Sequence, residues 1–366
     1  MTEATWPQWL PIRANLSALS PYGAPQVEAQ ASLNTNENPF PLSPELVAAI
    51  SARVAEVAAT LNRYPDRDAT ALRTRLASYI KEETGANVDS TNIWAANGSN
   101  EIIQSLFLAF GTGGAIGFLP SYSMHPLIAR VTLTPWRDGR RREDFSLDVD
   151  GAISEIAQVK PDLTFITTPN NPTGEAISIQ EIEKLAASTP GLLVIDEAYA
   201  EFSDEKSAVT LIAQYPHVVV IRTMSKAFSF AGARVGYLVA HPSVVDAMML
   251  VRLPYHLSTL TQGAALVALD FKDQLLAGVA ELRKQRGFVA DALNEMGLTV
   301  LPSQANFLLF SGFTSSSHQL WQAMLDRGIL IRDVGLSGYL RTTIGTGAEN
   351  EKFINALREC LAKEKS

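Results

Sequence analysis

The sequence predicts an α/β fold in which helices cover both faces of a large, mostly parallel sheet, followed by a smaller α+β unit. Short and nearly continuous apolar runs alternate with helix-length segments, which is typical of strands buried on both faces and joined by crossover helices. After about residue 262 this alternation ends and a long helical stretch follows. A chain of 366 residues also suits about two domains.

We therefore expect an N-terminal arm over residues 1–42 that joins the small domain, a large domain over 43–262 and a small domain over 263–366. The arm is expected to be irregular because prolines interrupt it repeatedly, at Pro7, Pro11, Pro21, Pro25, Pro39 and Pro41. A helix should follow at about 43–59, since Ser43 is a suitable N-cap and Pro44 suits the first helical position.

The remaining elements are predicted from hydrophobic patterning. Further helices are expected at about 69–82, 101–110, 178–188, 263–295 and 317–327, with a last helix at the C-terminus. Strands of the large sheet are expected at 92–96, 115–119, 132–136, 163–167, 192–196, 218–222 and 235–240. Strands of the small domain are expected at about 298–301, 306–310 and 338–344.

Charge and composition exclude several classes of protein. With 38 acidic against 30 basic residues, the net charge of −8 argues against a broad surface for nucleic acid or anionic membranes. The single cysteine, Cys360, excludes an intrachain disulfide and a cysteine-based metal site, and suits a reducing cytosol. The start of the chain does not resemble a signal peptide, and no run approaches about 20 apolar residues. None of the five histidines has metal-ligand spacing. We expect a cytoplasmic protein without a metal site.

Polar residues follow three of the predicted strands, where ligands bind in open α/β sheets. The turn Asn97-Gly98-Ser99-Asn100 opens a helix, and the free N–H groups of such a turn suit a phosphate, although many helices begin in this way. Asn171 lies in a proline-rich turn that can aim its amide or can simply be a tight turn. Asp196 ends a strand and is either a functional anion or a helix cap.

Lys226 is unusual because it lies in an apolar, hydroxyl-rich stretch, and lysine is rarely buried without a function. A desolvated lysine with a lowered pKa is what Schiff-base chemistry requires. Thr223, Ser225 and Arg234 are candidate phosphate donors beside it. Each of these residues alone is weak evidence, but their combination is not. A phosphate turn, an asparagine, an aspartate, a lysine and an arginine occur in this order at strand ends.

These motifs resemble the signature of the class I/II, fold-type I aminotransferases, which depend on pyridoxal phosphate. The resemblance covers essentially the whole chain, and the spacings of 25, 30 and 8 residues between the four motifs match that family. The four motifs are Asn171-Pro172-Thr173-Gly174, Asp196-Glu197-Ala198-Tyr199, Ser225-Lys226 and Arg234-Val235-Gly236-Tyr237. Segments 33–39 and 64–66 resemble the histidinol-phosphate aminotransferase branch, and segment 19–26 resembles its actinobacterial form. His256 departs from the asparagine of many relatives, which leaves the detail of the pocket open.

The resemblance implies a fold-type I enzyme that transfers an amino group between L-histidinol phosphate and 2-oxoglutarate in histidine biosynthesis. An aromatic amino-acid aminotransferase is the alternative, because it shares the cofactor residues. A transcription regulator built on such a domain would need an added DNA-binding helix-turn-helix, which the proline-broken arm and the acidic charge disfavour. A nicotinamide dehydrogenase is disfavoured because the glycines at 111–114 precede a strand.

The resemblance also assigns roles at the cofactor. Lys226 would bind pyridoxal phosphate covalently and act as general base, Asp196 would pair with the ring nitrogen, and Asn171 and Tyr199 would bind the phenolic oxygen. Tyr122 matches the aromatic residue that stacks on the ring, although it can also be a core tyrosine. The residues expected at the cofactor phosphate are Gly98, Ser99, Asn100, Thr223, Ser225, Arg234 and, from a partner subunit, Tyr64, which implies a homodimer with a shared site.

For the substrate, the resemblance assigns Arg341 to the α-carboxylate of glutamate, and the same guanidinium can also bind a phosphate. The further candidates for substrate binding are Arg332, Tyr22, Asn100 and Asn36, with Tyr255 at the imidazole. Arg332 can instead pair with Asp333 or another acid.

Overall fold

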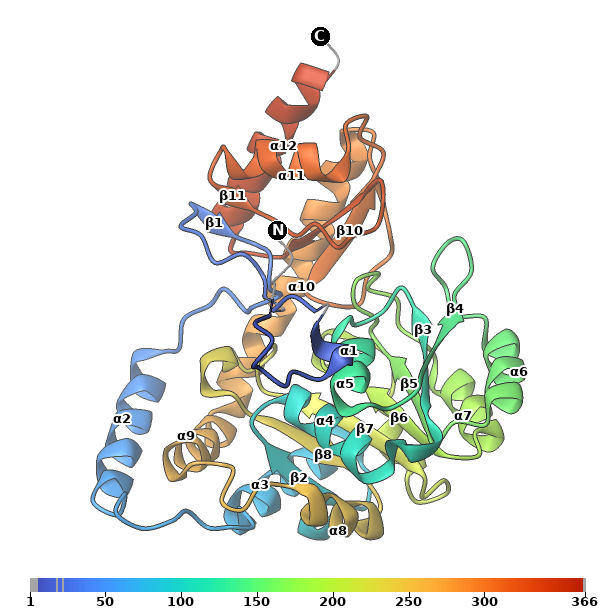
Figure 1. Cartoon of the computed structure of the whole chain (residues 1–366). Coiled ribbons are helices and arrows are strands. Elements are labelled where there is room, and N and C mark those ends of the chain that lie inside the picture. Colours follow the sequence, from blue (N-terminus) through green and yellow to red (C-terminus); the bar gives the residue numbers. More distant parts are fainter. Residues whose placement is uncertain (1–5, 18, 22, 365–366) are drawn as a thin grey trace.

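The computed structural model describes residues 6–17, 19–21 and 23–364, and it shows a large sheet with helices on both faces below a smaller unit (Figure 1). The sheet has seven strands in the order β2-β8-β7-β6-β5-β3-β4, and β8 alone runs antiparallel to its neighbours. This confirms the predicted α/β fold with a mostly parallel sheet. The strands are β2 (Ile93–Ala96), β3 (Ala115–Leu119), β4 (Trp136–Arg140), β5 (Leu163–Thr167), β6 (Leu192–Asp196), β7 (Val218–Thr223) and β8 (Gly236–Val239).

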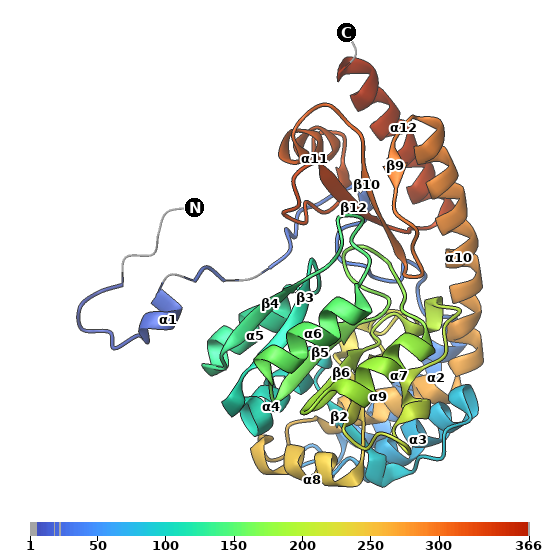
Figure 2. The same cartoon turned by 90° about the vertical axis from the view of Figure 1, so that its right-hand side faces the viewer.

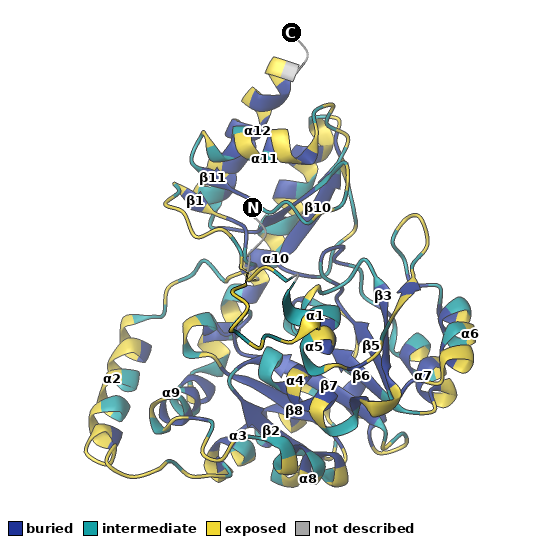
Figure 3. Cartoon of the chain, in the orientation of Figure 1, coloured by how far each residue is buried: buried dark blue, intermediate teal, exposed yellow. Residues whose placement is uncertain are grey.

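Two hydrophobic clusters lie on opposite faces of this sheet, because successive side chains of a strand point to opposite faces. One cluster is covered by α4 (Ser99–Phe110), α5 (Met124–Thr132) and α8 (Pro242–Val251). The other is covered by α3 (Thr70–Thr84), α6 (Val149–Val159), α7 (Ile179–Ser188) and α9 (Thr259–Asp270), with α2 (Pro44–Ala58) packed on α9. Figure 3 shows the buried sheet between helices whose outer sides are exposed.

The smaller unit is an antiparallel sheet, ordered β12-β10-β9, packed with helices. The long helix α10 (Lys272–Glu295) runs along both units (Figure 2). The other elements are β9 (Thr299–Val300), β10 (Phe307–Ser311), α11 (Ser317–Leu325), β11 (Ile329–Leu330), β12 (Tyr339–Thr343) and α12 (Gly347–Glu364). The arm contributes α1 (Ala14–Ser17) and β1 (Ala31–Ser32), and β1 pairs in parallel with β11. Short 3₁₀ turns lie at Ser90–Asn92, Gly111–Gly113, Ala200–Phe202, Ala208–Leu211 and Ala231–Ala233.

Two of the predicted elements are wrong. Residues 132–136 are not a strand, because α5 ends at Thr132 and the strand begins at Trp136. This strand, β4, pairs only with β3 at the edge of the sheet, so it is mostly solvent-accessible and lacks the apolar run that marks the inner strands. The expected helix at 263–295 is instead two helices, α9 and α10, which meet at Phe271.

A buried ion pair joins β6 and β7 at their carboxyl ends. Arg222 Nε lies 2.8 Å from Glu197 Oε2, and Arg222 Nη1 lies 3.1 Å from Glu201 Oε1. Removing one partner of such a pair typically costs about 3–5 kcal/mol, because it leaves a buried charge uncompensated. Side chains alternate along a strand, so Asp196 and Thr223 face the opposite side of the sheet from Glu197 and Arg222.

Within the described ranges, no helix combines the length and apolar character that crossing a membrane requires.

Candidate active site

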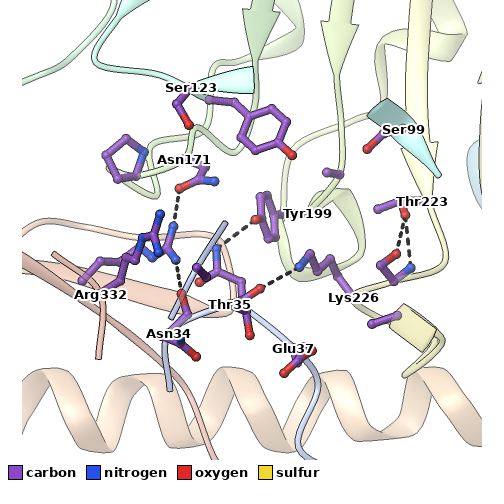
Figure 4. A pocket seen from close by; sticks show the side chains of 18 of the residues that line it. Asn34, Thr35, Glu37, Ser99, Ser123, Asn171, Tyr199, Thr223, Lys226 and Arg332 are labelled. Carbon is purple, nitrogen blue, oxygen red and sulfur yellow. Dashed lines mark hydrogen bonds between the residues drawn. The ribbon is translucent and has the colours of Figure 1, made fainter. Parts of the chain in front are cut away.

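A cavity of about 440 Å³ lies at the carboxyl ends of the central strands, and residues of the arm and of the smaller unit complete its walls (Figure 4). Most of the predicted site residues line it, although they come from segments far apart in the sequence. Those residues are Asn36, Ser99, Asn100, Tyr122, Asn171, Asp196, Tyr199, Thr223, Ser225, Lys226, Arg234, Arg332 and Arg341.

Lys226 follows β7 and projects into the cavity, where its Nζ donates a hydrogen bond to the carbonyl oxygen of Thr35 at 2.9 Å. Burial, helped by the positive charges of Arg341 and Arg234, lowers the pKa of Lys226 to about 8. The carboxylate of Glu37 acts in the opposite direction. Roughly a tenth of this amine is therefore neutral at pH 7, which is far more than for an ordinary lysine.

Asp196 ends β6 with its carboxylate buried at 2% exposure against the cavity. Its Oδ1 accepts a hydrogen bond from the Ala198 N–H at 3.2 Å, and its Oδ2 lies 3.2 Å from Nε2 of the buried His125. A carboxylate held in this way can bind a protonated ring nitrogen.

Asn171 and Tyr199 both line the cavity, and hydrogen bonds from neighbouring side chains orient them. Asn171 Oδ1 accepts a hydrogen bond from Arg341 Nη1 at 2.6 Å, which leaves its amide N–H₂ to donate elsewhere. The Tyr199 hydroxyl accepts from Asn36 Nδ2 at 2.9 Å. Asn36 was predicted to bind substrate; it lines the cavity, but its side chain is engaged with Tyr199 and Thr343.

One group of donors surrounds the N-terminus of α4. Gly98 precedes α4 with φ of +82° and offers no side-chain cap to the first N–H groups of the helix. The hydroxyls of Thr223 and Ser225 lie 3.0 Å apart at the cavity wall, and Arg234 lines it as well. A Cβ on Gly98 would lie 2.7 Å from Arg234 Nη2, so the glycine allows the guanidinium to approach. A helix N-terminus, two hydroxyls and a guanidinium form a donor set that fits a phosphate.

A second cationic group lies on the wall formed by the smaller unit. Arg332 and Arg341 are paired in an antiparallel bridge, so their side chains emerge on the same face. Arg341 is held by hydrogen bonds to Asn171 and to the carbonyl oxygen of Asn34. The sequence also allowed Arg332 to pair with Asp333, but no ion pair joins these two residues in the described part of the chain.

Several predicted residues lie away from the cavity lining. Tyr64 and Tyr255 are stacked on each other at a ring-centroid distance of 4.5 Å, and they are 79% and 40% exposed. Gly98 lies behind the lining, against Arg234. Tyr22 lies outside the described residues. Tyr122 lines the cavity and donates to Asn100 Oδ1 at 3.1 Å.

Sequence reasoning missed His125, Thr35 and Glu37. Thr35 acts through its backbone carbonyl, which carries no sequence signal. His125, in the first turn of α5, contacts Asp196 and Phe165 only through tertiary packing. Glu37 lies within a segment whose turn character was evident, so its carboxylate could have been named. No group of three or more histidine, cysteine, aspartate or glutamate residues placed to hold a metal occurs among residues 6–17, 19–21 and 23–364.

Comparison with known proteins identifies similar chains. The family described as aminotransferase class I and II matches residues 28–357. The histidinol-phosphate aminotransferases of Nocardia farcinica and Rhodococcus jostii are 55% and 54% identical over 97% of this chain, covering 93% and 94% of theirs. A solved histidinol-phosphate aminotransferase from Sinorhizobium meliloti, in complex with pyridoxal-5'-phosphate, aligns with a TM-score of 0.81 over 92% of each chain. At 24% identity, this last likeness supports the fold alone.

The pKa of Lys226 leads to a prediction for its reactivity. In protein freed of cofactor, acylation of Lys226 by a small amine-reactive reagent should be half-maximal near pH 8, because the neutral amine is the nucleophile. Arg341→Gln removes a positive charge and should raise the midpoint, whereas Glu37→Gln removes a negative charge and should lower it, each by roughly half a unit or more. Peptide mass spectrometry across pH 6 to 11 measures this, and shifts of the opposite signs would contradict it.

Proposed function

The chain belongs to the class I and II aminotransferases, and from this premise we propose that it is a cytoplasmic histidinol-phosphate aminotransferase. It would transfer the amino group between L-histidinol phosphate and 2-oxoglutarate, giving imidazole acetol phosphate and L-glutamate. The observation that carries the proposal is the 55% identity over nearly the whole chain to relatives of that name. The pair of arginines that lines the same cavity as Lys226, Arg332 and Arg341, supports it independently.

The residues of the cavity fit pyridoxal phosphate. When bound, this cofactor supplies an electron-withdrawing ring that stabilises the charge left on the substrate carbon as its C–H bond breaks. Asp196 would hold the ring nitrogen, and Asn171 and Tyr199 would donate hydrogen bonds to the phenolic oxygen. Tyr122 would cover the ring. The phosphate would be held by the N–H groups of Ser99 and Asn100 and by Thr223, Ser225 and Arg234.

Lys226 would attach the cofactor and, once released, move the proton. Its Nζ accepts a proton from the reacting carbon only when the amine is neutral, and burial beside Arg341 makes this form accessible near neutral pH. The hydrogen bond from Nζ to the Thr35 carbonyl orients the amine within the cavity.

Arg332 and Arg341 would bind the anionic end of both substrates. A guanidinium forms two parallel hydrogen bonds with a carboxylate or a phosphate, so Arg341 can hold glutamate and histidinol phosphate in turn. A phosphate monoester carries nearly two negative charges at pH 7, against one for a carboxylate. The second guanidinium, Arg332, emerges on the same face and suits that additional charge.

We further propose a homodimer in which Tyr64 of each subunit reaches the cofactor phosphate in the other. In the single chain Tyr64 is highly exposed and stacked on Tyr255 outside the cavity, where it has no evident function. Tyr255, which we propose lines the imidazole pocket, would be carried to the partner's site by the same stacking contact.

Subunit complementation tests the shared site. Lys226→Ala and Tyr64→Ala proteins are each expected to be impaired, but refolding them together should restore activity, because half of the sites in the mixed dimers combine an intact Lys226 with an intact Tyr64. The mixture should sediment with twice the mass of one chain. A monomer, or a mixture no more active than the two variants apart, would contradict the proposal.

The half-reaction with single substrates tests the substrate assignment. Protein loaded with pyridoxal phosphate is mixed separately with histidinol phosphate, glutamate and phenylalanine, and the loss of the cofactor's long-wavelength absorbance is followed. We expect fast loss with histidinol phosphate and glutamate and loss at least tenfold slower with phenylalanine. Faster loss with phenylalanine would instead assign an aromatic amino-acid aminotransferase, and protein that binds no pyridoxal phosphate would overturn the proposed function.

A further inference from the structure

Asn36 is fixed in place more completely than a substrate contact requires. It is only 2% exposed and adopts a left-handed backbone conformation with φ of +55°, which asparagine tolerates better than most residues. Its backbone N–H donates to Thr343 Oγ1 at 3.0 Å, and its carbonyl oxygen accepts from Asn306 Nδ2 at 3.1 Å. The backbone of Asn36 is thus hydrogen-bonded to the smaller unit, while its side chain donates to Tyr199, which follows β6 of the large sheet.

Thr343 determines which way the Asn36 amide points. The Thr343 hydroxyl oxygen already accepts the N–H of Asn36, so its single proton must be donated, and Asn36 Oδ1 lies 3.1 Å away as the acceptor. A reversed amide would place a second donor against this hydroxyl and would take away the acceptor of its proton. The network therefore directs Oδ1 to Thr343 and Nδ2 to Tyr199.

The amide orientation in turn determines the direction of the Tyr199 hydrogen bond. Asn36 Nδ2 can only donate, and it lies 2.9 Å from the Tyr199 hydroxyl oxygen, which therefore acts as the acceptor. The hydroxyl proton of Tyr199 cannot be given to Asn36 and must be donated to another acceptor. Tyr199 lines the cavity, and the proposed acceptor there is the phenolic oxygen of the cofactor.

We propose that Asn36 is a positioning residue that, locked by Thr343, makes Tyr199 donate its proton into the cavity. This inference rests on the proposed function, since it needs a bound pyridoxal phosphate, but it does not depend on which amino acid the enzyme uses. It gives Asn36 a role in tuning the cofactor rather than in holding substrate. It also explains why an amide, and not a hydroxyl or a carboxylate, occupies this position.

The pH midpoint of the cofactor's absorbance change measures this effect without substrate. Asn36→Asp keeps the shape of the side chain and tolerates the backbone conformation, but its ionised carboxylate accepts a hydrogen bond where the amide donates one. Tyr199 would then donate to the carboxylate, and the cofactor's phenolic oxygen would lose a hydrogen bond that favours its charged form. We expect the midpoint to rise by about one pH unit, a tenfold change in the equilibrium.

Two controls separate this role from a structural one. In the Tyr199→Phe background, Asn36→Asp should shift the midpoint by less than a few tenths of a unit, because the group through which it acts is gone. Thr343→Val lacks the hydroxyl that orients the amide, so it should raise the midpoint. Thr343→Ser keeps this hydroxyl, so its midpoint should stay near the wild-type value. The Thr343 variants also serve if Asn36→Asp does not fold.

The inference would be overturned if Asn36→Asp shifted the midpoint equally with and without the Tyr199 hydroxyl. It would also be overturned if the midpoint of Thr343→Val equalled that of the wild type. Protein that lacks the cofactor absorbance altogether would overturn the proposed function, and this inference with it. An enzyme that prefers another amine donor but shows the predicted shifts would leave the inference standing while the substrate assignment fails.

Discussion

The buried ion pair between Arg222 and Glu197 holds the carboxyl ends of β7 and β6 together on one face of the sheet. Because side chains alternate along a strand, the neighbouring residues Asp196 and Thr223 face the cavity on the other side. The interaction that stabilises these strand ends is therefore separated by the sheet from the groups that contact ligands. Lys226 follows β7 by only three residues, so its placement depends on the same strand end.

The positive charge of the cavity has two consequences at once. Arg341, Arg332 and Arg234 suit anionic groups at two places on the wall, and two of these arginines also lower the pKa of Lys226. A bound anion would offset part of their charge, so substrate binding and the proton affinity of Lys226 are coupled. Asn171 adds a direct link, since its amide oxygen binds Arg341 while its N–H₂ group is left to donate elsewhere.

The central strands and the residues that follow them could be predicted from sequence, because buried parallel strands are continuous apolar runs and their ends meet at one edge. β4 could not, because an edge strand carries polar residues such as Arg137 and Asp138 and has no such run. The contacts of His125 and Thr35 depend on tertiary packing and a backbone carbonyl, which local patterns do not reveal. The role proposed for Tyr64 comes from the family resemblance alone, since within the single chain it is an exposed tyrosine with no feature that marks it.

The proposed function depends most on Lys226 as the group that attaches the cofactor and moves the proton. Lys226→Ala protein, dialysed against pyridoxal phosphate, measures this directly, with Lys184→Ala on the exposed side of α7 as the control. We expect Lys226→Ala to bind the cofactor reversibly but to transfer no measurable amino group between glutamate and an acceptor, whereas the control should behave as the wild type. Turnover within tenfold of the wild type in Lys226→Ala would contradict this expectation.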